Sequence, residues 1–152
     1  MADVPESSDL WQYWILMAEE SQLAAIQAHE AGYTRSASSR YYYSAYQAIT
    51  ALLHYTGQRP PEKTADSEDE TGREGWSHQK TPDIIIENCG RLIRSKDERQ
   101  RLASNLKELY KIRLEADYHG KEKIKISSLV SVARKSKYLM KVVLGILPER
   151  EK

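Results

Sequence analysis

The stretch from Leu102 to Ala116 most narrowly limits how this chain can fold. Apolar residues recur there three, four or seven positions apart, at Leu102, Leu106, Leu109 and Ala116, which is the spacing of one face of an α-helix. Arg113 lies on the same face, four residues after Leu109 and three before Ala116. Because an unpaired buried charge is too costly, this guanidinium must be paired, or must face a cleft or a second chain. The stretch predicts a packed helix whose apolar face carries a polar site.

Similar periodicity marks the rest of the chain. We expect helices over residues 9–32, 34–55, 81–94, 95–117 and 127–148. Gly32 and Gly57 are expected to end the first two, and Pro82 lies in the first turn of the third. No stretch has a convincing strand, repeat or glycine-rich phosphate loop. The sequence therefore predicts an all-α protein, an up-and-down helical bundle of about five helices, as a single domain over residues 8–148 with flexible termini at 1–7 and 149–152.

Residues 58–80 break this pattern. They contain two prolines, two glycines and many acids but no apolar period, so we expect a long, exposed acidic loop. Trp76 and His78, near its end, are the exception, and we expect them to anchor the loop to the core.

The net charge of +1 conceals an asymmetry. Residues 1–90 hold 6 Lys/Arg and 14 Asp/Glu, a balance of −8, whereas residues 91–152 hold 17 and 8, a balance of +9. A basic C-terminal half suits an anionic ligand such as RNA, but the two halves could equally attract each other, or the charges could be solvated helix faces.

The single cysteine, Cys89, excludes an internal disulfide and a cysteine-based zinc cluster, and is expected to be a buried apolar residue. We expect neither a metal nor a cofactor. The polar, acidic N-terminus does not resemble a signal peptide, and no apolar run approaches the length of a membrane span, so a cytoplasmic protein is expected.

The candidate polar site consists of Arg113, Asp117 and His119, with Tyr118 between the last two. Arg113 and Asp117 are four residues apart and share a helix face, so a purely structural ion pair is one interpretation. A regular helix would turn His119 away from Arg113. The two can serve one site if the helix unwinds after about Ala116, or if two copies of the chain meet.

Three segments, in this order in an all-helical chain of this length, resemble the HEPN domain family: SASSRYYYSAYQAITALL, WSHQKTPDIII and LYKIRLEADYH. The resemblance covers about residues 10–147 and is nearest to the small stand-alone type that is often encoded beside a minimal nucleotidyltransferase. It implies a helical bundle that commonly forms a homodimer. Many such proteins are metal-independent endoribonucleases defined by an Arg, four to six residues and a His, a pattern that Arg113 and His119 match.

The resemblance also implies roles for these residues. His119 would act as acid or base while the ribose 2′-OH attacks the adjacent phosphate to give a 2′,3′-cyclic phosphate; Arg113 would stabilise the developing charge, and Asp117 would orient either one. Several members are toxins neutralised by the nucleotidyltransferase partner, in some cases by AMP transfer to a tyrosine near the motif, for which Tyr118 is the comparable residue.

The same segment, Arg113 to Tyr118, also resembles the pattern R-x-x-A-D-Y of a subgroup without a dependable histidine. This similarity implies an alternative function, a non-catalytic module that binds a nucleotide or the nucleotidyltransferase. The further candidate binding residues are Arg40, Tyr43, Gln47 and His78; in that subgroup a histidine often stands where this chain has Gln47.

Overall fold

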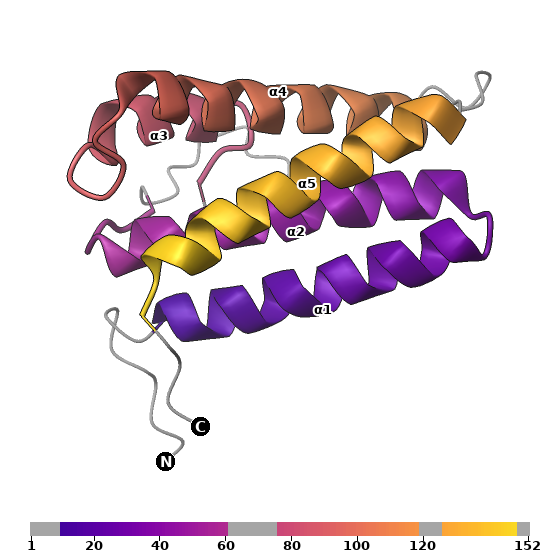
Figure 1. The fold of residues 1–152 in the computed structure, drawn as a ribbon, viewed down its shortest axis with the longest axis horizontal. Helices are drawn as coiled ribbons and strands as arrows, with labels where there is room; N and C mark the ends of the chain where they lie inside the picture. The colour runs from indigo at the N-terminus through magenta and orange to yellow at the C-terminus, as the bar shows by residue number, and fades with distance from the viewer. Residues whose placement is uncertain (1–9, 61–75, 119–125, 149–152) are drawn as a thin grey trace, which may run out of the picture.

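The computed structural model describes residues 10–60, 76–118 and 126–148, and all of its regular structure there is helical. The five α-helices are α1 (Leu10–Glu30), α2 (Thr34–Tyr55), α3 (Thr81–Asn88), α4 (Lys96–Tyr118) and α5 (Ile126–Ile146). The long helices α1, α2, α4 and α5 run alternately in opposite directions, with the short α3 beside α4 (Figure 1). The predicted all-α bundle is confirmed.

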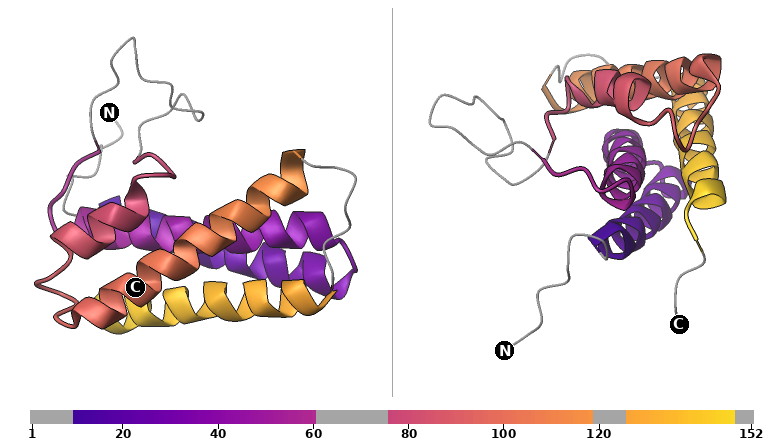
Figure 2. Two further views of the ribbon diagram at one scale, coloured as in Figure 1. Left: turned by 90° about the horizontal axis from the view of Figure 1, so that it is seen from above. Right: turned by 90° about the vertical axis from the view of Figure 1, so that its left-hand side faces the viewer.

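Helix α2 is the centre of the bundle. It packs against α1, α4 and α5, which surround it in the end-on view of Figure 2. Its alanines allow close approach, because Ala37, Ala45, Ala48 and Ala51 are fully buried. Hydroxyl groups add links between helices: Ser44 Oγ donates to Ala18 O at 2.9 Å, and Ser136 Oγ donates to Tyr41 O at 2.7 Å.

The ends of α1 and α2 follow the predicted glycine stops. Gly32 and Gly57 have φ values of 82° and 87°, a left-handed conformation that costs a glycine little. After α2, the N–H of Gln58 bonds to Leu53 O at 3.2 Å and closes the last turn.

The predicted extent of the third helix, to residue 94, was wrong. Helix α3 ends at Asn88, and the N–H of Cys89 makes its last bond, to Ile85 O. The next amides turn back, since the N–H groups of Leu92 and Ile93 both bond to Cys89 O. This turn buries both Cys89 and Ile93, so the apolar spacing that suggested more helix comes from a compact turn.

Part of the predicted acidic loop, residues 61–75, lies outside the described residues, as do the predicted flexible termini. Trp76 and His78 are buried, at 3% and 6% exposure, as expected of anchors. None of the described helices is both long enough and apolar enough to cross a membrane.

Candidate functional site

Arg113 lies on the inner face of α4 and is 8% exposed. Its guanidinium carbon is 5.1 Å from the ring centre of Tyr43 and 5.9 Å from the ring centres of Tyr42 and Tyr110. A guanidinium within about 6 Å of an aromatic face is attracted by the negative charge density of the ring, more strongly when water is excluded. The prediction that Arg113 occupies the core face is confirmed, and aromatic partners for it come from its own chain.

His78 contacts two of the tyrosines that lie near Arg113, Tyr42 and Tyr110. Its Nδ1 atom shares a hydrogen bond of 2.5 Å with the hydroxyl of Tyr42, and its ring centre is 4.3 Å from that of Tyr46. The His78 and Tyr110 rings are nearly parallel, with an interplanar angle of 5° and centres 5.5 Å apart. His78 therefore connects α2 to α4 through ring contacts on both helices.

The main chain before His78 is fixed as well. The hydroxyl of Tyr46 donates a 2.5 Å hydrogen bond to Trp76 O. The hydroxyl of Thr81 donates to Ser77 O at 2.6 Å and so ties the same segment to the start of α3. The chain that enters α3 is thus held against the middle of α2, beside Arg113.

We call this set the aromatic cluster; its members are Tyr42, Tyr43, Tyr46, His78, Tyr110 and Arg113. Burial raises the pKa of Tyr42 far above its ordinary value, and Tyr46 adds to the rise while Arg113 opposes it. The Tyr42 phenol is therefore neutral; its hydroxyl shares the hydrogen bond with His78, and its ring faces Arg113. The cluster therefore holds the cation of Arg113 in a largely dry, aromatic setting.

Two of the predicted binding residues, Tyr43 and His78, belong to this cluster. Arg40 lies one turn earlier on α2 and is exposed. Gln47 lies between α1 and α2, where its side-chain nitrogen donates to Ser21 Oγ at 2.6 Å and to Met17 O at 3.1 Å. The structure therefore places Gln47 in a helix–helix contact.

The predicted catalytic residues after Arg113 are only partly described. The backbone of Asp117 and Tyr118 forms the last turn of α4, but their side chains, and the whole of His119, lie outside the described residues. The helix continues two residues past Ala116, so the unwinding that would bring His119 toward Arg113 does not occur before Tyr118.

Tyr42, Tyr46 and Tyr110 are members of the site that were not predicted from the sequence. The spacing of Tyr110, three residues before Arg113, was a usable signal because residues three apart share a helix face. Nothing local indicated that His78 would bind Tyr42, 36 residues away.

A second histidine, His54, is buried in the last turn of α2. His54 is 6% exposed, stacks on Trp14 at 6.1 Å and meets the edge of Trp76 at 5.0 Å. Its Nδ1 atom has no hydrogen-bond partner, and burial lowers its pKa below 6.5. This histidine is a neutral packing residue. Within the described ranges, no group of three His, Cys, Asp or Glu side chains is arranged to hold a metal ion.

A scan against protein-family models returns no match for this chain, and a search of curated proteins returns none.

Proposed function

We propose that this chain is an HEPN-like protein that acts as a metal-independent endoribonuclease. The observation that carries the proposal is the placement of Arg113: its guanidinium is fixed among three tyrosine rings near the end of α4, six residues before His119. A cation whose orientation is set before the substrate arrives stabilises developing phosphoryl charge without reorganisation.

In the proposed reaction, His119 takes the proton from a ribose 2′-OH, and that oxygen attacks the adjacent phosphorus. The bond to the 5′-oxygen breaks, this oxygen takes up a proton from water, His119 returns its proton to the solvent, and a 2′,3′-cyclic phosphate remains. Arg113 neutralises charge on the non-bridging oxygens, and Asp117 orients one of the two groups. A DNA strand lacks the nucleophile and is not cleaved.

The resemblance to the HEPN family also implies a biological role for the proposed activity. The protein would be the toxin of a pair, active as a homodimer in the cytoplasm, and a nucleotidyltransferase would be its antitoxin. Tyr118 is the candidate residue for modification by that partner.

The proposal is tested with purified protein, a labelled RNA and the matching DNA, with and without EDTA. Cleavage of RNA alone, unaffected by EDTA and ending in a cyclic phosphate, is the expected result. Arg113→Met, which keeps side-chain volume, and His119→Ala should each abolish it. Arg101→Ala is the matched control, because Arg101 is an exposed arginine of the same helix. Cleavage of DNA at a similar rate, or full activity of Arg113→Met, would rule the mechanism out.

A second function is favoured by the burial of Arg113. At 8% exposure, the arginine offers little surface to a phosphate. A non-catalytic module would use the aromatic cluster to stiffen a surface that binds a nucleotide or the nucleotidyltransferase. Binding of either ligand by a wild-type protein that leaves RNA intact would select this alternative.

A further inference from the structure

Three tyrosine rings contact both Arg113 and His78. The guanidinium carbon of Arg113 is 5.1 Å from the ring centre of Tyr43 and 5.9 Å from those of Tyr42 and Tyr110. The ring centre of His78 is 5.5 Å from those of Tyr42 and Tyr110 and 6.1 Å from that of Tyr43. Because buried side chains are closely packed, the position of the His78 ring limits the positions that these tyrosines can take around the arginine.

A hydrogen bond fixes one of these rings more narrowly than packing alone. The hydroxyl of Tyr42 and Nδ1 of His78 are 2.5 Å apart, and both residues are buried. A hydrogen bond weakens steeply as its angle departs from the preferred range, and water cannot replace this one inside the bundle. The bond therefore sets where the Tyr42 ring lies beside the guanidinium of Arg113.

The main chain that carries His78 is itself anchored. The hydroxyl of Tyr46 donates to Trp76 O at 2.5 Å, and the hydroxyl of Thr81 donates to Ser77 O at 2.6 Å. These two bonds join the residues just before His78 to α2 and to α3. The His78 ring is therefore a fixed point against which the tyrosine rings are set.

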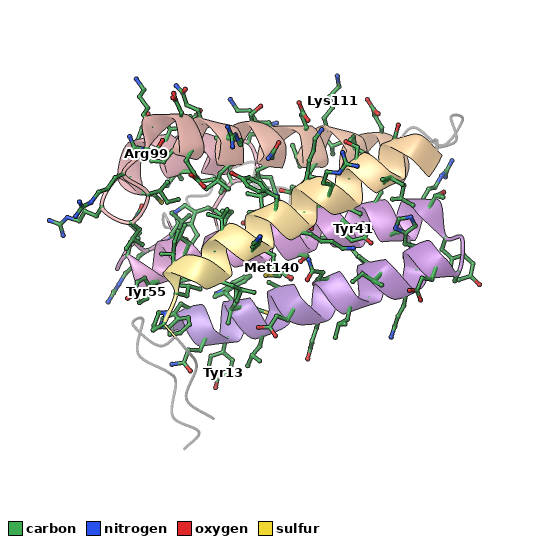
Figure 3. The ribbon with its side chains drawn as sticks, viewed as in Figure 1. Tyr13, Tyr41, Tyr55, Arg99, Lys111 and Met140 are labelled. Carbon is green, nitrogen blue, oxygen red and sulfur yellow. The ribbon has the colours of Figure 1, made fainter. Side chains whose placement is uncertain are left out.

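Arg113 depends on such support because an arginine side chain is long and has many rotamers. Lys111, two residues earlier on α4, is exposed and points away from the bundle (Figure 3). Arg113 lies on the inner face of the same helix and is confined among the rings. A guanidinium that is already oriented needs no reorganisation when charge develops on a phosphate, and this is the condition for strong stabilisation of a transition state.

We propose that His78 is a positioning residue for Arg113 in the cleavage of RNA. It holds the Tyr42 hydroxyl and contacts the three tyrosine rings, and so it orients the guanidinium before the substrate binds. The effect on catalysis rests on the proposed function, whereas the orientation of Arg113 by His78 depends on no reaction. Because the phosphoryl charge grows only as the 2′-oxygen attacks, loss of His78 should lower kcat and leave KM almost unchanged.

The kinetic test uses His78→Phe, which keeps a flat ring but removes the hydrogen bond to Tyr42. Its kcat for RNA cleavage should fall by about tenfold to 100-fold, with KM changed by less than about twofold. The double variant with Tyr42→Phe should be no slower than the slower single variant, because both substitutions remove the same bond. His54→Phe is the matched control and should keep full kcat, since this buried histidine contacts Trp76 of the same segment and Trp14 of α1.

An NMR signal reports the position of Arg113 without any reaction. The Nε atom of this arginine is buried, so its proton exchanges slowly with water, and the nearby tyrosine rings displace its signal from that of an exposed arginine. Arg113→Met identifies the signal by its loss. In His78→Phe the signal should move toward the position of exposed arginines, and in His54→Phe it should stay in place.

A folded His78→Phe protein whose Arg113 signal stays in place, or moves without a change in kcat, would overturn the proposal. So would an equal loss of kcat in His54→Phe. If the wild type leaves RNA intact, the proposed ribonuclease function fails, and the Arg113 signal alone then decides whether His78 orients this guanidinium. If His78→Phe fails to fold, Tyr42→Phe removes the same hydrogen bond and is followed by the same two measurements.

Discussion

Removing the hydroxyl of Tyr42 tests whether the aromatic cluster is held together as its geometry indicates. Tyr42→Phe keeps the ring, and with it the contacts to Arg113 and Tyr110, but deletes the 2.5 Å hydrogen bond to His78 Nδ1. Both partners are buried, so water cannot replace the lost group. Leaving a buried polar atom unsatisfied costs about 1–3 kcal/mol.

The adjacent tyrosine provides a matched control. The Tyr41 hydroxyl also bonds to a histidine Nδ1, at 3.2 Å, but its partner His29 is only half-buried. His29 can bond to water after Tyr41→Phe, so we expect a loss of about 0.5 kcal/mol. The two substitutions delete the same group from consecutive residues of one helix, and only the surroundings of the hydrogen bond differ.

Urea unfolding followed by circular dichroism at 222 nm measures both losses. In thermal unfolding, a loss of about 2 kcal/mol corresponds to a decrease in Tm of about 4–8 °C for a chain of this size. His78→Phe, which retains a flat ring beside Tyr110, completes a double-mutant cycle with Tyr42→Phe and should show coupling of about 1–2 kcal/mol. Equal losses for Tyr41→Phe and Tyr42→Phe, or no coupling with His78, would refute this account of the cluster.

Two further predictions concern the buried titratable groups. Burial raises the pKa of Cys89 to about 11, and Arg99 opposes the rise. A thiol reagent at pH 8 should therefore label the folded protein only at the rate at which it unfolds. Immediate labelling without urea would contradict the buried position of this thiol. Because burial lowers the pKa of His54 in the folded state, the unfolded chain takes up the proton first as the pH falls through about 6.5, and the free energy of unfolding should decrease from pH 7 to pH 5.5. His54→Phe should flatten this decrease, whereas an unchanged pH dependence in that variant would show that another group is responsible.

The helices were predictable because their signals are local. A 3.6-residue period and a glycine stop are read within one segment, and α2 has the bounds expected from them. The end of α3 was missed because Cys89 and Ile93 are buried by a turn, and burial in a turn can imitate helical spacing. The core position of Arg113 was predictable for the same local reason, since Leu109 and Ala116 fix the face on which it lies.

The partners of Arg113 were not predictable, because they come from three separate segments. The tyrosines of α2, the residues around His78 and Tyr110 of α4 meet only when the chain folds. These contacts also bear on the counterpart expected for Arg113. A charged residue on an apolar stripe suggested a second protomer as its counterpart, but tyrosines of the same chain surround this guanidinium.

The proposed catalysis depends on which copy of the chain supplies His119. Helix α4 is regular through Tyr118, and six residues of helix turn a side chain by about 120° from its starting face. His119 can then share a phosphate with Arg113 of its own chain only through a change of direction after Tyr118; otherwise the two groups come from different protomers. If the site is shared, mixing the inactive variants Arg113→Met and His119→Ala should restore part of the RNA cleavage, because one site of the mixed dimer then holds both intact residues. No recovery in the mixture would instead place the complete site within one chain.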